Sequence, residues 1–598
     1  MSPWIPLLVS LSACDPAPAD GPSPGLHDPL PVTDQLLRIS MALRGVRPEV
    51  EELDRVQDDP DALEELVDDY LASPEFGLMV RDLYAEALLL RGVYPVLPAI
   101  DALDGYTRGE IARTLWEAPL RLIEDVVLTD QPFTSILTAD YTMATGLMER
   151  ALQVSRRTAD LPHNVWGRAD WLDHRPAAGL LASSGLWLQH LSAGSNNHRG
   201  RANHLARALL CTDFLDRDVT ISGSVDLADL AQVAQAVSSD PACVSCHQSL
   251  DPLAAYLWGF RPTDMFHIAN RAYQRDDDGE LVIEDETGEP FCMPSDTLLA
   301  EGLDPEGDCF PLIHYVVGFE RRWDLNGLRP PGYFGLEHGE ELRLDDLGRA
   351  IADDPRFSLC TAQRMAGYLG QIPAGDVPFE IAAELQTGFI DSGYDLKALA
   401  RQVVLSEPFL TRTPASEDDF VYGLQTLRPE QAARVFAQLT GFVWQAEPDP
   451  ADCGETCWGT VDMVTSGGYG LRPMLGGTDA DTKARPSLTP TPIQTLALGR
   501  LAAEAAAEVV RHDFARSQPA DRLLLREMNP TDTDEGSVRR QLVELHLRVL
   551  GERVDVGSDV VDEELALYQD ALGTPADPAL AWELVLTVLL QDARMVFY

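Results

Sequence analysis

Apolar side chains recur every three or four positions along residues 34–91, which is the spacing of one face of an amphipathic helix. Thr33 and Asp34 precede the first of these faces and predict a helix N-cap there. Gly45 predicts the end of that first helix. We interpret the Ser-Pro-Glu-Phe-Gly run at residues 73–77 as the end of a later helical segment.

A similar order of helix, glycine-containing break and second helix returns in the middle and at the end of the chain. The segments with helical spacing are 202–211, 360–369, 394–404, 493–512, 538–550 and 577–597. We interpret residues 34–91, 360–409 and 538–597 as three loosely similar helical modules, with ordinary helical punctuation as the alternative of equal weight. Turn residues around Leu281-Val282-Ile283 predict a small β-hairpin. The sequence therefore predicts a mainly α, multidomain protein with one small hairpin element.

Changes in composition predict six segments along the 598 residues. They are a lipoprotein-like signal peptide at 1–14, a Pro/Gly-rich tether at 15–32, an N-terminal helical domain at 33–160, a motif-bearing domain with the hairpin at 161–338, a helical domain at 339–415 and a mixed, then helical region at 416–598.

The chain is strongly acidic, with 96 Asp and Glu against 46 Lys and Arg and a net charge of −50. Such a field repels phosphate backbones and anionic membrane surfaces, which excludes nucleic acid as a partner. It could also steer a small basic protein toward this one. The plainer alternative is a general acidic bias of the surface.

An apolar run at the N-terminus ends in Leu-Ser-Ala-Cys14, which resembles the lipobox of bacterial lipoproteins. Cys14 is then the predicted site of lipidation. The run is short, and the first basic residue of the chain is Arg38. No other stretch approaches the roughly twenty apolar residues of a spanning helix. We therefore expect an exported protein in the periplasm or at the cell surface, held to the membrane only by a lipid anchor.

The motif with the most specific chemistry is Cys243-Val-Ser-Cys246-His247. Cys-x-x-Cys-His is the attachment signature of a c-type haem. One helical turn can present both thiols to the porphyrin vinyl groups, and the adjacent histidine can ligate the iron from the proximal side. Half of a zinc site, a dithiol or disulfide, and chance are the alternatives.

The sixth iron ligand would decide between electron transfer and ligand chemistry. Among the Met and His residues of the chain, we favour Met265 or His267, because the segment after the motif must fold back over the haem edge. The further candidates are His190, His198, His204, Met293, His314 and Met365.

Six further cysteines remain once Cys14 and the motif are set aside. In an oxidising compartment they predict disulfides, with Cys292–Cys309 and Cys453–Cys457 as local pairs and Cys211–Cys360 by elimination. Six buried thiols are the competing interpretation.

Several blocks of the sequence resemble a family of large, uncharacterised haem-motif proteins of planctomycetes and myxobacteria, which carry cytochrome-c-associated domains of unknown function. The blocks cover about half the chain and lie at residues 36–76, 198–214, 243–260, 288–291, 353–371 and 392–409. The most specific block joins Cys-x-x-Cys-His to Leu250-Asp-Pro. Leu250 stands where the family often has Met, and Ala254 where it often has Gly.

The resemblance implies a secreted or surface protein with a covalent haem c and no agreed activity. The sequence thus predicts an exported cytochrome-c-like protein that passes electrons to a redox partner protein at the envelope. A surface scaffold whose motif is a disulfide or zinc clip is the alternative, and a haem peroxidase-like enzyme is the second.

Overall fold

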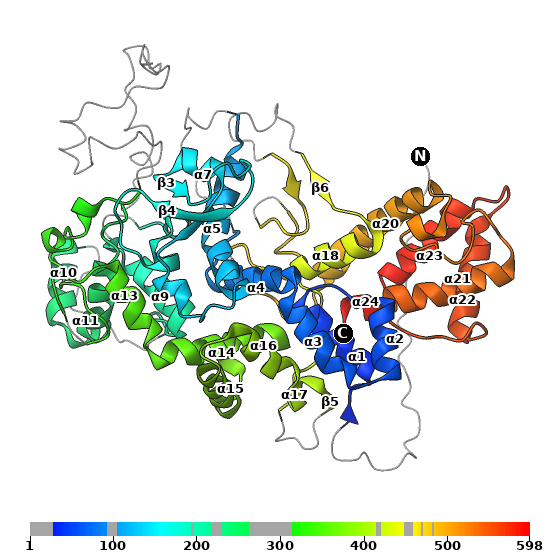
Figure 1. The fold of residues 1–598 in the computed structure, drawn as a ribbon, viewed down its shortest axis with the longest axis horizontal. Coiled ribbons are helices and arrows are strands. Elements are labelled where there is room, and N and C mark those ends of the chain that lie inside the picture. Colours follow the sequence, from blue (N-terminus) through cyan, green and yellow to red (C-terminus); the bar gives the residue numbers. More distant parts are fainter. Residues whose placement is uncertain are drawn as a thin grey trace, which may run out of the picture.

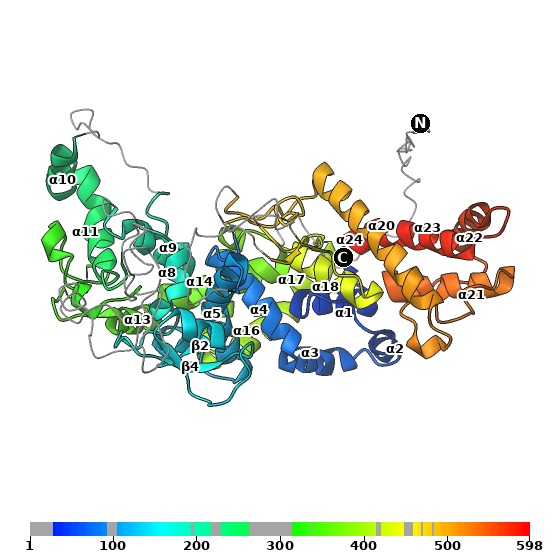
Figure 2. The ribbon, with the colours of Figure 1, turned by 90° about the horizontal axis from the view of Figure 1, so that it is seen from above.

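The computed structural model describes residues 28–92, 105–192, 196–216, 229–261, 314–335, 338–413, 420–447, 459–467, 470–480 and 483–598. Within them the fold is mainly helical, with small antiparallel sheets of two or three strands, which confirms the predicted fold class. The molecule is elongated: α10 and α11 lie at one end and α21 and α22 at the other in both views (Figures 1 and 2). The predicted hairpin around Leu281 lies outside the described residues.

The first helices are α1 (Val32–Leu43), α2 (Val50–Asp58), α3 (Ala62–Ala72) and α4 (Pro74–Ala87). The predicted N-cap was wrong, because α1 begins at Val32 with Pro31 as its cap, so that Thr33 and Asp34 lie in the first turn. The predicted stop at 73–77 was also wrong. Pro74 opens α4, where a residue without an N–H costs no helical hydrogen bond.

Gly45 follows the end of α1, as predicted. Its φ of +69° lies in the left-handed region that glycine adopts without strain. A Cβ at this position would also lie 2.5 Å from Nη2 of Arg434. Gly45 therefore permits both the turn after α1 and the close approach of an arginine from the C-terminal part of the chain.

A small three-stranded sheet packs beside the long helix α5 (Arg108–Leu128). Its antiparallel order is β2-β4-β3. The elements of this region are α6 (Ser135–Thr138), β2 (Thr142–Ala144), α7 (Gly146–Ala151), β3 (Val154–Arg156), β4 (Gly167–Trp171), the 3-10 helix η2 (Gly179–Ala182) and α8 (Ser184–Gln189). The sequence did not predict this sheet, because strands of three to five residues are too short to show a clear alternation.

The middle of the chain forms a further set of helices. These are α9 (Arg199–Leu210), α10 (Leu230–Ser239), α11 (Pro241–Ala255), α13 (Leu344–Ala352), α14 (Pro355–Gly370), α15 (Phe379–Asp391), α16 (Leu396–Val404) and α17 (Glu407–Leu410), with 3-10 turns η5 (Val317–Phe319), η6 (Asp324–Asn326) and η7 (Ala374–Asp376). Among them, α9, α15 and α16 pack against α14. Strand β5 (Thr411–Thr413) then pairs with β1 (Asp28–Pro29).

The C-terminal part is built on the 23-residue helix α20 (Pro492–Phe514), which confirms the helix predicted at 493–512. The other elements are α18 (Pro429–Thr440), β6 (Gln445–Ala446), β7 (Val461–Asp462), the 3-10 turn η9 (Pro519–Asp521), α21 (Glu535–Leu545), a π-helical turn (His546–Leu550), α22 (Asp559–Leu572), α23 (Pro578–Leu590) and α24 (Ala593–Val596).

Two large apolar clusters form the core. The first extends from Leu36 to Tyr422, and the second joins Met41 to residues between Leu427 and Met595. The last residue lies where they meet, because the hydroxyl of Tyr598 accepts hydrogen bonds from Gln371 (3.0 Å) and Gln431 (2.8 Å). The helices of the two clusters are thus joined through the C-terminal residue.

His546 gives the C-terminal part a pH dependence. Its ring is fully buried, with Nε2 3.0 Å from Glu564 and Nδ1 3.3 Å from Glu552. Burial lowers the pKa of His546, but the hydrogen bonds and charges of Glu564 and Glu552 outweigh it, so the pKa lies above its ordinary value.

A raised pKa means that this stabilisation is complete below the unfolded pKa of about 6.5 and is lost as pH rises through the folded value. We therefore expect the Tm of the wild type to fall more steeply than that of His546→Gln between about pH 6 and about pH 8. Thermal unfolding followed by circular dichroism measures both curves. Parallel curves for the two proteins would contradict the assignment.

Candidate haem-attachment site

The Cys-x-x-Cys-His motif lies in the first half of α11. Asp240 caps this helix, since its Oδ1 accepts a hydrogen bond from the N–H of Ala242 at 2.9 Å, and Pro241 occupies the first helical position. The local sequence Asp-Pro therefore starts the helix two residues before Cys243. All three motif side chains are consequently held on regular helical backbone.

Helical spacing places Cys243, Cys246 and His247 on one face of α11, because residues three and four apart are neighbours on a helix. Both cysteines are free thiols and both are partly exposed. Burial, Asp240 and Cys246 together raise the pKa of Cys243.

Asp251, one turn after His247, orients the imidazole. Its Oδ1 lies 2.9 Å from Nδ1 of His247, and Arg199 binds both carboxylate oxygens of Asp251, with Nε 2.7 Å from Oδ1 and Nη2 3.0 Å from Oδ2. Burial raises the pKa of Asp251, but the hydrogen bonds from His247 and Arg199 outweigh it, so the pKa lies below its ordinary value.

An ionised carboxylate can only accept hydrogen bonds, so Nδ1 of His247 must be the protonated nitrogen. The lone pair of the neutral ring is then on Nε2, which is the atom free to ligate a metal. The His247 side chain keeps 23% of its surface exposed, whereas Asp251 keeps 7%. The imidazole is thus partly exposed, while the carboxylate that supports it is buried.

Helix α9 provides this support. Arg199 is its first residue, and the fully buried Arg201 fixes the same turn by donating hydrogen bonds to the carbonyl oxygens of His190 (2.7 Å) and Trp187 (3.0 Å). At the other end of α9, Cys211 forms a disulfide with Cys360 of α14. This bond confirms the pairing that was predicted by elimination.

The described candidates for a sixth ligand occupy other roles. Nε2 of His190 lies 2.8 Å from the carbonyl oxygen of Leu88, and its ring stacks on His204 with centroids 3.5 Å apart. Met365 is buried in the first core cluster.

The other two described histidine candidates, His198 and His314, are also buried. Nδ1 of His198 lies 3.1 Å from Arg201, and its ring contacts Trp258 edge-on. His314 packs on Phe260, and neither of its ring nitrogens has a hydrogen-bond partner. None of these contacts involves the motif face of α11. The favoured candidates Met265 and His267 lie outside the described residues, as do Met293, Cys14, Cys292, Cys309, Cys453 and Cys457.

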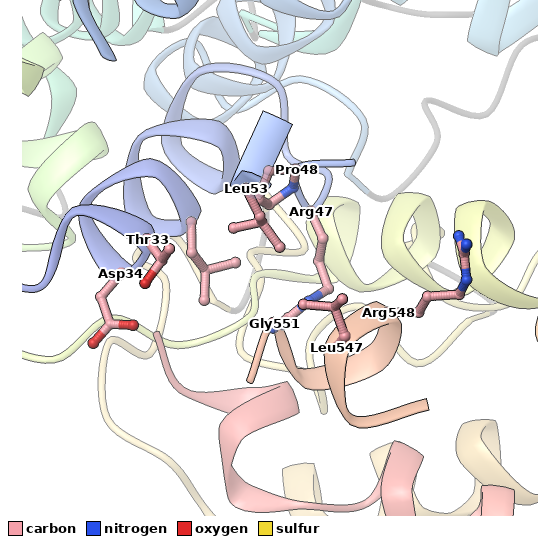
Figure 3. A pocket seen from close by; sticks show the side chains of 9 residues that line it. Thr33, Asp34, Arg47, Pro48, Leu53, Leu547, Arg548 and Gly551 are labelled. Carbon is pink, nitrogen blue, oxygen red and sulfur yellow. The ribbon is translucent and has the colours of Figure 1, made fainter. Parts of the chain in front are cut away.

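A small cavity of about 10 Å³ lies far from the motif, between α1 and the π-helical turn (Figure 3). The buried Arg47 lines it and extends toward Gly551, and burial lowers the pKa of Arg47 to about 10. Gly551 ends that helix, so the guanidinium lies at the negative end of the helix dipole. The cavity has room for little more than a water molecule and is part of the helix packing.

Across the described part of the chain, no three His, Cys, Asp or Glu side chains gather in a way that could hold a metal ion. Nor is any described helix both long and apolar enough to cross a membrane. No family model, curated protein or solved structure matches the chain.

Those residues fit a c-type haem. Two free thiols share a helix face with a histidine whose Nε2 is available, and Asp251 and Arg199 fix that histidine. The motif residues were predicted from the sequence, whereas the roles of Asp251 and Arg199 were missed. The i, i+4 spacing from His247 to Asp251 was a usable signal for the role of Asp251. The contact of Arg199 joins residues 52 positions apart and had no local signal.

Proposed function

We propose that this protein is an exported, cytochrome-c-like electron carrier that binds one covalent haem on α11. Cys243 and Cys246 would form the thioether bonds and His247 would be the proximal ligand. The observation that carries the proposal is the arrangement of two unpaired thiols and an oriented imidazole on one partly exposed helix face. A motif that arose by chance would have no reason to be accompanied by Asp251, whose carboxylate holds the proton on Nδ1 of His247 and leaves Nε2 as the ligand nitrogen.

The chain's own residues have simple roles in this proposal. Each thiol adds its S–H across a vinyl group, sulfur to one carbon and hydrogen to the other, so attachment needs no oxidant. Asp251 holds the proton on Nδ1 of His247 and keeps Nε2 free. The bound haem would supply one-electron chemistry through its ferrous and ferric states.

Export and the acidic surface complete the proposal. Cys14 would carry the lipid anchor, and the Cys211–Cys360 disulfide suits the oxidising compartment in which haem is attached. The net charge of −50 favours a basic protein as redox partner. The partner would then dock by attraction between opposite charges, and its association rate would fall with rising salt concentration.

Covalent haem is the testable core of the proposal. We expect protein exported from a bacterial host with haem-maturation machinery to keep its haem absorbance on the polypeptide after denaturation. The double variant Cys243→Ala/Cys246→Ala should lose that absorbance completely, because both thioether bonds are removed. Absorbance spectra and intact mass of the denatured protein measure the outcome.

Ser245→Ala is the matched control, because Ser245 lies inside the motif and supplies none of the proposed bonds; this variant should retain the haem. Wild-type protein that is exported and mature but carries no haem would overturn the proposal. Zinc bound in its place, or a Cys243–Cys246 disulfide, would instead identify the scaffold with a structural clip.

A further inference from the structure

Two charged residues outside the motif, Asp251 and Arg199, support the imidazole of His247. Asp251 shares Oδ1 between Nδ1 of His247 and Nε of Arg199, while its Oδ2 accepts from Nη2 of Arg199. The carboxylate is almost completely buried, and Arg199 is held by the first turn of α9. The three side chains thus form a continuous chain of hydrogen bonds that runs from Arg199 on α9 through Asp251 to His247, the proposed iron ligand.

A carboxylate behind a metal-bound histidine makes the imidazole a stronger electron donor, because it draws the Nδ1 proton toward itself. A stronger donor stabilises the more positive, ferric state of an iron relative to the ferrous state. The negative charge of Asp251 acts in the same direction. Arg199 acts in the opposite direction, because it competes for Oδ1 and neutralises the carboxylate.

We infer that Asp251 and Arg199 are positioning residues that set the reduction potential of the site, Asp251 lowering it and Arg199 moderating that effect. The inference rests on the proposed function, since it concerns the iron that His247 would ligate. It goes beyond that function by naming two residues of the chain that adjust the potential of that iron in opposite directions. It also gives Arg199, on a different helix from the motif, a part in redox tuning.

The geometry makes opposite changes at the two residues informative. Asp251→Asn keeps the size of the side chain but removes its charge, so the ferrous form of the iron should become more stable relative to the ferric form. Arg199→Gln frees the carboxylate of Asp251 to act on His247 alone, so the ferric form of the iron should become more stable relative to the ferrous form. A merely structural role would loosen the site in both variants and expose the haem to water, which would shift both potentials in the same direction.

Redox titration of the purified, full-length holoprotein tests the inference. At a fixed applied potential, the ferrous-to-ferric ratio should rise about tenfold in Asp251→Asn, which is about 59 mV for one electron. In Arg199→Gln the ratio should fall. Asp240→Asn is the matched control, because it removes a charge from the same helix without contacting His247, and Asn still caps a helix.

The outcomes separate the inference from the proposed function. Wild-type protein without covalent haem would overturn both. Haem-loaded variants with unchanged potentials, or with shifts in the same direction, would overturn the inference alone. If one variant fails to fold, as judged by circular dichroism, the other variant decides by the sign of its shift against Asp240→Asn.

Discussion

Loss of the Cys211–Cys360 disulfide is expected to lower the free energy of unfolding by about 5 kcal/mol, since the entropy that a cross-link removes from the unfolded chain grows with the loop it closes. This loop spans 149 positions and contains the whole of α10 and α11. The exposed Cys211 ends α9, whereas Cys360 is buried in α14. The bond therefore ties α9, the helix that carries Arg199, to α14.

Guanidinium denaturation of the wild type and Cys211→Ala measures this effect. Cys211→Ala is preferred to Cys360→Ala because Cys211 is an exposed residue, whereas truncation of the buried Cys360 would leave a cavity beside α14. In the presence of a reductant, the wild type should become as unstable as the variant. An oxidised wild type no more stable than Cys211→Ala would show that the cross-link contributes nothing to stability.

The mainly helical fold could be predicted from the sequence because helical spacing is a local property. The strong apolar periodicity that predicted a helix at 493–512 is confirmed by α20. Boundaries were less predictable. At Pro74 the chain ends one helix and starts the next within two residues, and proline is compatible with either event.

Only those residues of the site that lie next to one another in the sequence could be predicted. Cys243, Cys246 and His247 are adjacent in sequence, and their types already specify the chemistry. Arg199 reaches Asp251 from another helix, so its role depends on how α9 packs against α11. The same limit applies to the ion pairs that connect the N-terminal and C-terminal parts of the chain.

Asp82 is the centre of one such group of ion pairs. This buried carboxylate of α4 lies 2.6 Å from Nη1 of Arg91 and 2.7 Å from Nη1 of Arg434 on α18. Burial raises the pKa of Asp82, but the charges of Arg434 and Arg91 outweigh it, so the pKa lies below its ordinary value. Arg91 has a second partner in Glu117, whereas Asp82 is the only ion-pair partner of Arg434 among the described residues.

We expect Asp82→Asn to destabilise the protein by about 3 to 5 kcal/mol, because removing one member of a buried pair leaves the other charge uncompensated. The depressed pKa means that the contribution of Asp82 is complete above the unfolded pKa of about 3.9 and is lost as pH falls through the lower folded value. Guanidinium denaturation should therefore show a large difference between the two proteins at neutral pH, and this difference should shrink as the pH falls below about 3.9.

Two further variants test whether the uncompensated arginine causes the loss. Asp82→Asn combined with Arg434→Met should recover part of the stability, because the orphaned charge is removed together with its partner. Asp68→Asn is the matched control: this exposed aspartate pairs with Arg401 at the surface and should cost less than about 1 kcal/mol. Equal losses in Asp82→Asn and the double variant would show instead that the shape and hydrogen bonds of Asp82, rather than its charge, hold α4 to α18.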